Sequence, residues 1–153
     1  MKLKTGDPAP MFSAATTDGS TINLASYLGK KLVLYFYPMD DTPGCTKQAC
    51  SLRDHCGEIR DRGAAILGVS TQDVGSHQQF TAKYQLNFPL VADTDGSIGR
   101  AYGAMGGGFV GAAMNLMGMA NRITFIIDEN GHIAHIIDQP DCAHHAEEVL
   151  KLL

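Results

Sequence analysis

The sequence feature that most constrains the fold is a continuous apolar run at residues 32–37, which ends at Pro38. The run has no alternation of polar and apolar residues, so it is typical of a strand buried on both faces of a sheet. Such a strand requires a covering layer on each side of its sheet. The run therefore predicts a central strand in an α/β domain.

The residues after this strand carry the signals of a helix start. Thr42 is a favourable N-cap, and Pro43 suits the first helical position, where its missing N–H costs no hydrogen bond. Gly44 lets other groups approach the backbone closely. Cys45 then falls at the third helical position, where free N–H groups and the helix dipole favour a thiolate. We predict that Cys45 is the functional centre; the alternative is a small buried hydrophobic residue, the common role of a free cysteine.

A second cysteine, Cys50, follows five residues later on the same predicted helix. Five helical residues rise about 7.5 Å and rotate about 140°, which places the two Cα atoms roughly 8.5 Å apart, beyond the ~7 Å limit of a disulfide. A bond between Cys45 and Cys50 would require the helix start to unwind. Cys50 is thus either a resolving thiol or an inert cysteine on a helix face. Cys56 lies ~16 Å along the helix from Cys45 and is expected to be inert.

These motifs together resemble a known family. The pattern of residues 38–50, with a cysteine after an apolar strand and another five residues later, resembles peroxiredoxins of the peroxiredoxin Q, or bacterioferritin comigratory protein, type. The likeness covers nearly the whole chain. It runs from residues 6–10, through the cysteine motif, to residues 122–128 and 145–150.

The resemblance implies a role for each of five residues. Cys45 would be the peroxidatic cysteine and Cys50 the resolving cysteine. The Thr42 hydroxyl would orient the thiolate and the peroxide, and Pro38 would shield the pocket. Arg122 would hold the thiolate and stabilise negative charge on the departing oxygen.

The resemblance also implies a reaction without a metal or another cofactor. The thiolate would attack the O–O bond of hydrogen peroxide or an organic hydroperoxide and become a sulfenic acid, which Cys50 would convert to a disulfide. Thioredoxin or a similar dithiol donor would reset the enzyme. Gln48, where the family often has Glu or Gln, is a candidate hydrogen-bond partner for Arg122.

Length and composition predict one domain over residues 1–153. The chain is 44% hydrophobic with a net charge of −4, and it has no run of like charge that would favour nucleic acid or an anionic membrane. No signal-peptide or membrane-spanning stretch is present in the sequence. We therefore expect a cytoplasmic protein. Four cysteines are too few for a disulfide scaffold. The two cysteines of the implied reaction, Cys45 and Cys50, belong to one chain, so we expect a monomer.

Strand and helix signals alternate along the chain. Their order predicts a thioredoxin-like α/β fold, with a central mixed sheet flanked by helices and an N-terminal β-hairpin extension. The expected strands are residues 12–16, 21–24, 32–37, 64–70, 90–92, 122–128 and 132–138. The expected helices are residues 43–62, 75–84 and 143–153.

The segment of residues 103–121 departs most from the family pattern. Six of its nineteen residues are glycine, four are methionine and none is charged. Methionine adapts to surfaces of many shapes. The segment is either an adaptable wall for organic hydroperoxides, a docking or self-association surface, or simply a loop with a short packed helix.

The histidines do not predict a metal site. His144 and His145 are adjacent, so they diverge on a helix, and no CxxC pair completes a zinc set. We expect both to be partly exposed, with Asp141 capping the last helix. His55 and His77 are expected at the surface.

Two other classes of function remain open from the residues alone. A thioredoxin-like disulfide exchanger would depend on a CxxC motif, whereas this chain has Thr42 where the first sulfur would lie. A non-enzymatic redox sensor or a metal-binding module is the second class. Consumption of peroxide would separate both classes from a peroxidase.

Overall fold

The computed structural model describes residues 3–105 and 118–153. Its centre is a five-stranded mixed sheet in the order β5-β4-β3-β6-β7, and a separate two-stranded sheet is formed by β1 and β2. The strands are β1 (Ser13–Ala15), β2 (Thr21–Asn23), β3 (Lys31–Phe36), β4 (Ala64–Ser70), β5 (Leu90–Ala92), β6 (Ile123–Ile127) and β7 (Ile133–Ile137).

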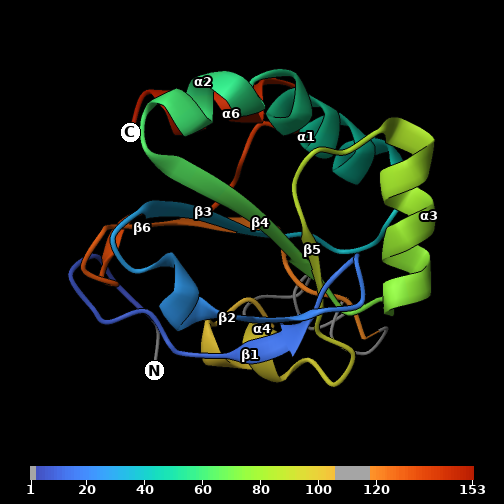
Figure 1. Ribbon diagram of the computed structural model, residues 1–153, viewed down its shortest axis with the longest axis horizontal. Coiled ribbons are helices and arrows are strands. Elements are labelled where there is room, and N and C mark those ends of the chain that lie inside the picture. The colour runs from blue at the N-terminus through green and yellow to red at the C-terminus, as the bar shows by residue number, and fades with distance from the viewer. Residues whose placement is uncertain (1–2, 106–117) are drawn as a thin grey trace.

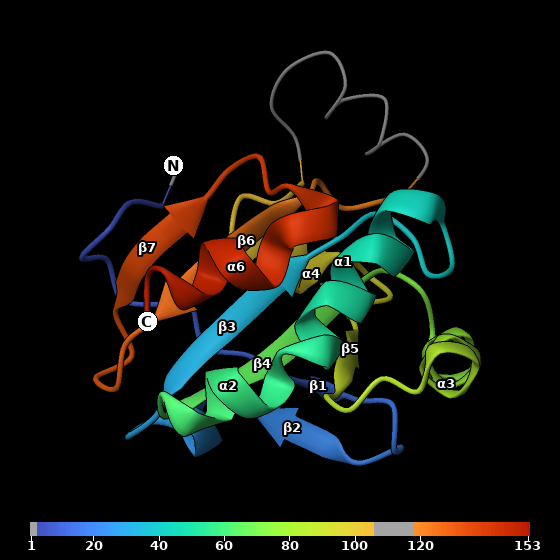
Figure 2. The same cartoon turned by 90° about the horizontal axis from the view of Figure 1, so that it is seen from above.

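The helices lie between these strands in the chain. The α-helices are α1 (Pro43–Asp54), α2 (Cys56–Asp61), α3 (Val74–Tyr84), α4 (Ser97–Ala101) and α6 (His145–Leu150), and the 3-10 helices are η1 (Leu24–Tyr27) and η2 (Cys142–His144). Helices α1, α2 and α6 cover one face of the central sheet, with α3 beyond its β5 edge, while the β1–β2 hairpin and α4 cover the other face (Figure 1). Figure 2 shows α1 and α6 side by side across the sheet.

Strand β3 occupies the middle of the sheet, as its apolar sequence predicts. It pairs in parallel with β4 and antiparallel with β6, and the residues from Leu32 to Phe36 are all buried. A hydrophobic core lies on each face: Val33 and Tyr35 belong to the core beneath the helices, whereas Leu34 and Phe36 belong to the core beneath the hairpin. The predicted α/β class and the β-hairpin extension are confirmed.

One predicted helix is wrong as a single element. Residues 43–62 form two helices, because the backbone leaves the helical conformation at His55, with φ −113° and ψ 12°. The ring Nδ1 of His55 lies 3.0 Å from the carbonyl oxygen of Ser51, the group that a continuing helix would bond through backbone N–H. The break leaves α1 as an independent helix of 12 residues.

The C-terminal helix is shorter than predicted. Asp141 caps a 3-10 turn, η2, by accepting the N–H of Ala143, and α6 begins only at His145. His144 is exposed, but the prediction of a partly exposed His145 is wrong because its side chain is fully buried. Its Nε2 lies 2.9 Å from the Thr124 hydroxyl oxygen.

Most of the Gly- and Met-rich segment lies outside the described residues, so its predicted roles stay predictions. At its base, the N–H of Asn121 donates to the carbonyl of Ala104. No helix within residues 3–105 or 118–153 is long and apolar enough to cross a membrane.

The buried histidine generates a prediction about acid stability. Burial lowers the pKa of His145, against the opposing effect of its hydrogen bond with Glu148. The unfolded chain, with an ordinary histidine pKa of 6.5, therefore takes up a proton more readily than the folded protein. We expect the free energy of unfolding to decrease as the pH falls through 6.5, and to decrease less in His145→Gln. Urea denaturation across this pH range measures it.

His144→Gln is the matched control. The neighbouring Asp141 raises the pKa of His144, so its protonation favours the folded state as the pH falls. Removal of the His144 imidazole should therefore make the acid-induced loss of stability steeper. If the free energy of unfolding varied with pH in the same way in the wild type and in His145→Gln, His145 would not be the source of the acid sensitivity.

Candidate active site

Cys45 lies at the start of α1, directly after the loop that leaves the C-terminal end of β3. It is the third residue of the helix, and Thr42 occupies the N-cap position as predicted. Cys45 is only 1% exposed. The N–H of Thr46 makes the first helical hydrogen bond to the Thr42 carbonyl. Among the described residues, none accepts the backbone N–H groups of Gly44 and Cys45, which are free to bind an oxygen or a thiolate.

Arg122 reaches this sulfur from a distant part of the chain. It directly precedes β6, and β6 pairs with β3 so that Ile123 lies opposite Phe36, at the sheet end where the loop to α1 begins. The Arg122 Nη1 donates to Cys45 Sγ at 3.4 Å and to Gln48 Oε1 at 2.9 Å. The structure thus brings together the predicted cysteine, arginine and glutamine. Gln48 is fully buried, and its side-chain oxygen holds the guanidinium by this hydrogen bond.

Gly44 makes room for this arginine. A Cβ atom at Gly44 would lie 3.0 Å from Arg122 Nη2, closer than ordinary van der Waals contact. The absence of a side chain therefore lets the guanidinium lie against the first turn of α1.

The Thr42 hydroxyl does not cap the helix, contrary to the sequence prediction. It donates instead to the carbonyl of Met39 at 2.9 Å. The hydrogen of the hydroxyl is thereby used within the loop, and the lone pairs of its oxygen remain able to accept a hydrogen bond. Met39 is 38% exposed and carries no charge, and Arg122 is the described cation that contacts Cys45.

Asp40 anchors the loop before α1 to α3. Its carboxylate accepts hydrogen bonds from the Tyr37 hydroxyl at 2.6 Å and the Ser76 hydroxyl at 2.8 Å. It also lies 2.7 Å from Nδ1 of His77, whose Nε2 lies 2.9 Å from the Val91 carbonyl. The prediction that His77 is a surface residue is wrong, since it is fully buried. A polar network of this kind is stable only when each member has its partner.

The Gln72 side chain holds the same loop by bonding to backbone groups of the loop. Its Oε1 accepts the N–H of Asp40 at 3.0 Å, and its Nε2 donates to the Pro38 carbonyl at 3.3 Å. Pro38 itself is buried at the end of β3. Sequence reasoning missed Asp40, Gln72 and His77. The acidic pair at residues 40 and 41 was the available signal, but nothing in the sequence showed that α3 would face it.

The other cysteines differ in their surroundings. Cys50 lies on α1 and is partly exposed, and its helix is unbroken from Cys45. The next residue, Ser51, accepts the N–H of Ala146 on its hydroxyl, which ties the far half of α1 to α6. Cys56 is buried, and burial raises the pKa of its thiol. Cys142 Sγ lies 3.6 Å from the position of a Cβ atom on Gly44.

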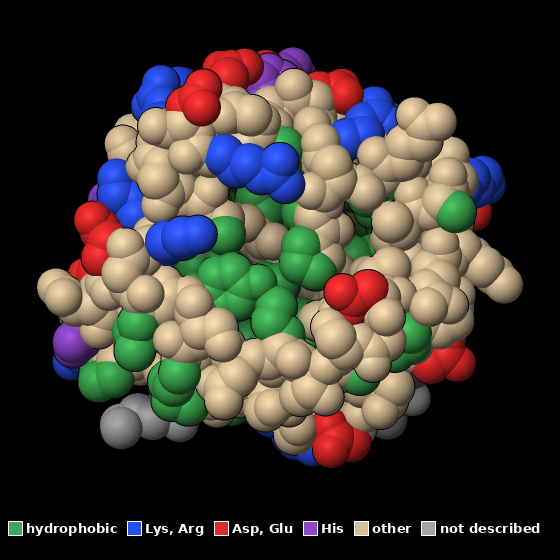
Figure 3. All heavy atoms as spheres, in the orientation of Figure 1, with side chains coloured by type: hydrophobic (Ala, Val, Ile, Leu, Met, Phe, Trp, Pro, Cys, Tyr) green, Lys and Arg blue, Asp and Glu red, His purple; other side chains and the backbone are tan. Residues whose placement is uncertain are grey.

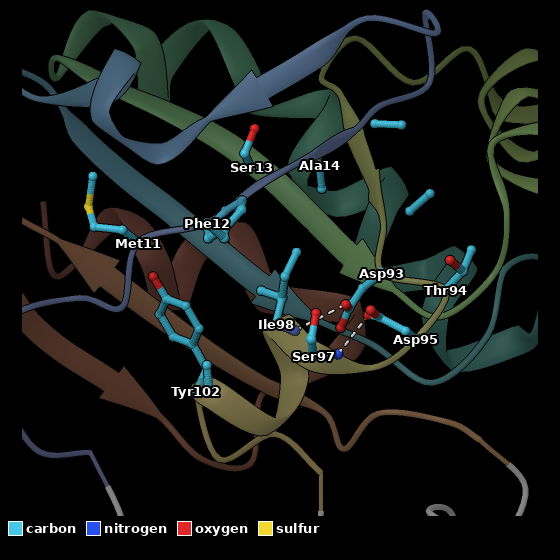
Figure 4. Close-up of a pocket in the computed structure, with 13 residues that line it drawn as sticks. Met11, Phe12, Ser13, Ala14, Asp93, Thr94, Asp95, Ser97, Ile98 and Tyr102 are labelled. Carbon is cyan, nitrogen blue, oxygen red and sulfur yellow. Dashed lines mark hydrogen bonds between the residues drawn. The ribbon is translucent and has the colours of Figure 1, made fainter.

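A cavity of about 530 Å³ lies away from these cysteines, between the β1 region and the start of α4 (Figure 4). Its carboxylates are used within the protein: Asp93 accepts the N–H groups of Ile98 and Gly99, and Asp95 accepts that of Ser97. Burial raises the pKa of Asp93. The described residues include no cluster of three or more side chains able to hold a metal. Cys45, in contact with Arg122, is the candidate reactive residue.

The chain is similar to known proteins over nearly its whole length. The sequence profile of the AhpC/TSA family matches residues 5–136. Peroxiredoxin Bcp of Escherichia coli strain K12 is 39% identical over 152 residues, which cover 99% of this chain and 96% of that protein.

Solved structures similar to this chain include two bacterial proteins. A cysteine-to-serine variant of PrxQ from Xylella fastidiosa is 30% identical, covers 99% of this chain and 95% of its own, and superposes with a TM-score of 0.90. The bacterioferritin comigratory protein of Xanthomonas campestris, studied for its alkyl peroxide reduction activity, is 31% identical, with coverages of 97% and 96% and a TM-score of 0.85. These similarities confirm the predicted thioredoxin-like fold.

The close approach at Gly44 generates a prediction about thiol reactivity. Gly44→Ala should displace the guanidinium of Arg122 and weaken a charge-assisted contact with Cys45. We expect alkylation of Cys45 by iodoacetamide at neutral pH to slow by about fivefold, equivalent to about 1 kcal/mol. Gly57→Ala is the matched control, because nothing lies within 4 Å of a Cβ atom there. Equal rates in both variants would show that Arg122 does not depend on Gly44.

The loop anchor generates a prediction about stability. Asp40→Ala leaves His77 buried without its partner, so the free energy of unfolding should fall by about 3 kcal/mol in urea denaturation. Lys83→Ala is the comparison, because it removes an exposed ion pair with the adjacent Asp41. A surface pair contributes little, so this variant should change stability far less. Similar losses in the two variants would contradict the anchoring role of Asp40.

Proposed function

The chain belongs to the AhpC/TSA family as a peroxiredoxin of the Bcp and Q type, a thiol-dependent peroxidase, and we propose that Cys45 is the thiol that attacks the peroxide. The observation that carries this assignment is the 3.4 Å contact between Arg122 Nη1 and Cys45 Sγ at the start of α1. A cation and free helical N–H groups both stabilise sulfur as the nucleophilic thiolate. No CxxC motif is present for a disulfide exchanger.

The first step forms a sulfur–oxygen bond and breaks the O–O bond. The Cys45 thiolate attacks one peroxide oxygen and becomes a sulfenic acid, while the electron pair of the O–O bond leaves on the other oxygen. A proton converts that oxygen to water or an alcohol. The thiolate is oxidised and the peroxide is reduced.

Arg122 and Thr42 have complementary roles in this step. The guanidinium binds the negative charge, which moves from sulfur to the departing oxygen during the attack. The Thr42 oxygen accepts the O–H of the peroxide, because its own hydrogen is given to Met39. Pro38, buried at the end of β3, limits the access of water to the sulfur.

Cys50 completes the cycle by a change in conformation. Its sulfur attacks Sγ of the Cys45 sulfenic acid, a disulfide forms, and the hydroxyl leaves as water. The intact helix holds the two residues too far apart, so the turns of α1 between them must unwind. Asp40 holds the chain before this region and Ser51 holds it after Cys50. The two anchors restrict the unwinding to the first turns.

The substrates are hydrogen peroxide and organic hydroperoxides, and a thioredoxin-like dithiol reduces the disulfide. The Xanthomonas relative, studied for alkyl peroxide reduction, supports the organic substrates. We assign the enzyme to the cytoplasm, where dithiol donors are kept reduced. A monomer is sufficient because both cysteines lie on one helix.

Peroxide consumption with a dithiol donor tests the assignment. Wild-type protein should turn over, whereas Cys45→Ser should lose activity on the order of a thousandfold, since the nucleophile is gone. Cys50→Ser should reduce one equivalent of peroxide and then stall as a sulfenic acid, unless the external thiol resolves it. Mass spectrometry of oxidised protein should find Cys45 linked to Cys50.

Cys142→Ser is the matched control for the resolving step. Cys142 is partly exposed near the first turn of α1, so it is the competing partner for Cys45. The variant should keep wild-type turnover and the same disulfide. A link from Cys45 to Cys142 in the oxidised wild type would reject Cys50 as the resolving residue. No consumption of peroxide by the wild type would reject the peroxidase itself.

A further inference from the structure

A second cavity lies at the opposite end of the sheet from Cys45. It has a volume of about 430 Å³ and is lined by the start of β4, the loop before β3, α2 and the chain before β5. Cys45, by contrast, follows the C-terminal end of β3, which runs parallel to β4. Figure 3 shows a hollow with a hydrophobic floor near the centre of the view, with Lys or Arg side chains along one side of its rim and an Asp or Glu side chain on the other. We call this cavity the β4 notch.

The notch exists because β5 covers only half of β4. Strand β5 pairs with Gly68, Val69 and Ser70, so residues 64–67 have no neighbouring strand on that side. The last bond of the ladder runs from the Gly68 N–H to the Pro89 carbonyl. The ladder cannot continue, because Pro89 has no N–H to donate to the Ile66 carbonyl.

The chain before Pro89 is also held away from β4. The carbonyl of Asn87, which would be the next acceptor for an N–H of β4, instead accepts a hydrogen bond from Arg60 Nη2 at 2.9 Å. Backbone groups alternate between the two sides of a strand, so the N–H and C=O of Ile66 point the same way as those of Gly68. Among the described residues, none bonds these two groups of Ile66. They form an open strand edge inside the notch.

The charge of the notch is positive although the protein is acidic. Lys30 and Arg60 are the charged residues in its lining, and no acidic residue lines it, whereas the whole chain has a net charge of −4. Lys30 enters from the loop after η1, and Arg60 enters from α2 on the other face of the sheet. Tyr27 and Phe88 contribute aromatic surface to the walls.

We propose that the β4 notch binds an extended peptide segment with acidic side chains, which adds to the sheet as a short strand beside β4. The open edge of residues 64–67 is about 13 Å long, enough for a peptide of about four residues. The peptide backbone would bond the free N–H and C=O of Ile66, as in other cases of strand addition. This site is independent of the peroxidase assignment.

The two cations select the side chains of the peptide. Successive side chains of an extended peptide point to opposite faces of the sheet, so neighbouring acidic residues reach Arg60 on one face and Lys30 on the other. An isolated carboxylate would satisfy the cations but leave the edge of β4 open. If the β4 edges of two copies of the protein paired with each other, the cations of the two notches would lie close together. This repulsion disfavours such pairing.

The test measures binding of an acidic peptide to the full chain at low salt. The probe is a fluorescein-labelled peptide with the sequence Gly-Glu-Glu-Val-Glu-Gly, followed by fluorescence anisotropy. Lys30→Glu should weaken its binding by about tenfold, because a surface ion pair is lost and replaced by repulsion. Lys151→Glu, an exposed lysine outside the lining, is the charge-matched control and should bind as the wild type does.

Backbone pairing has its own readout. Hydrogen exchange at the Ile66 amide should slow when the peptide is bound, while peroxidase activity stays unchanged. Two analogues, N-methylated at alternate sets of residues, should behave differently, because only one set of N–H groups faces β4. The proposal is overturned if no saturable binding occurs at millimolar peptide, if Lys30→Glu binds like the wild type, or if Ile66 exchange is unaffected. Equal competition by free glutamate would indicate a carboxylate site without strand addition.

Discussion

The contact between the Arg122 guanidinium and the Cys45 sulfur is the interaction around which the reactive end of the molecule is arranged. It joins the residue before β6 to the first turn of α1, and it needs Gly44 for room and Gln48 for a second hydrogen bond. The antiparallel pairing of β6 with β3 delivers the arginine to the correct end of the sheet. The central strand, buried on both faces, thus also sets the electrostatics of the thiol.

Sequence reasoning recovered the parts of this arrangement that are written in local patterns. The apolar run of β3, the Thr42 cap position and the third-position Cys45 follow from strand burial and helix-start preferences. Arg122 and Gln48 were not accessible that way, because their proximity to the cysteine depends on the pairing of distant strands. They were identified only through resemblance to the family.

The features that sequence reasoning missed arise from contacts between elements. His77 was expected at the surface, yet its packing against Asp40 and the Val91 carbonyl buries it completely. At the break, a ring nitrogen of His55 lies beside the Ser51 carbonyl of the preceding helix, a contact that helix propensities do not register. The open edge of β4 likewise follows from where β5 ends, at Pro89, rather than from the sequence of β4 itself.

The attachment of Ser51 to Ala146 has a consequence for how the catalytic cycle responds to temperature and mutation. Because α1 is fastened just beyond Cys50, formation of the proposed Cys45–Cys50 disulfide would melt its first turns while the sheet and α6 keep their packing. The free energy of this local melting is then separate from the free energy of global unfolding. Substitutions on the outer surface of residues 43–50 would therefore change the speed of the cycle through the free energy of this local melting.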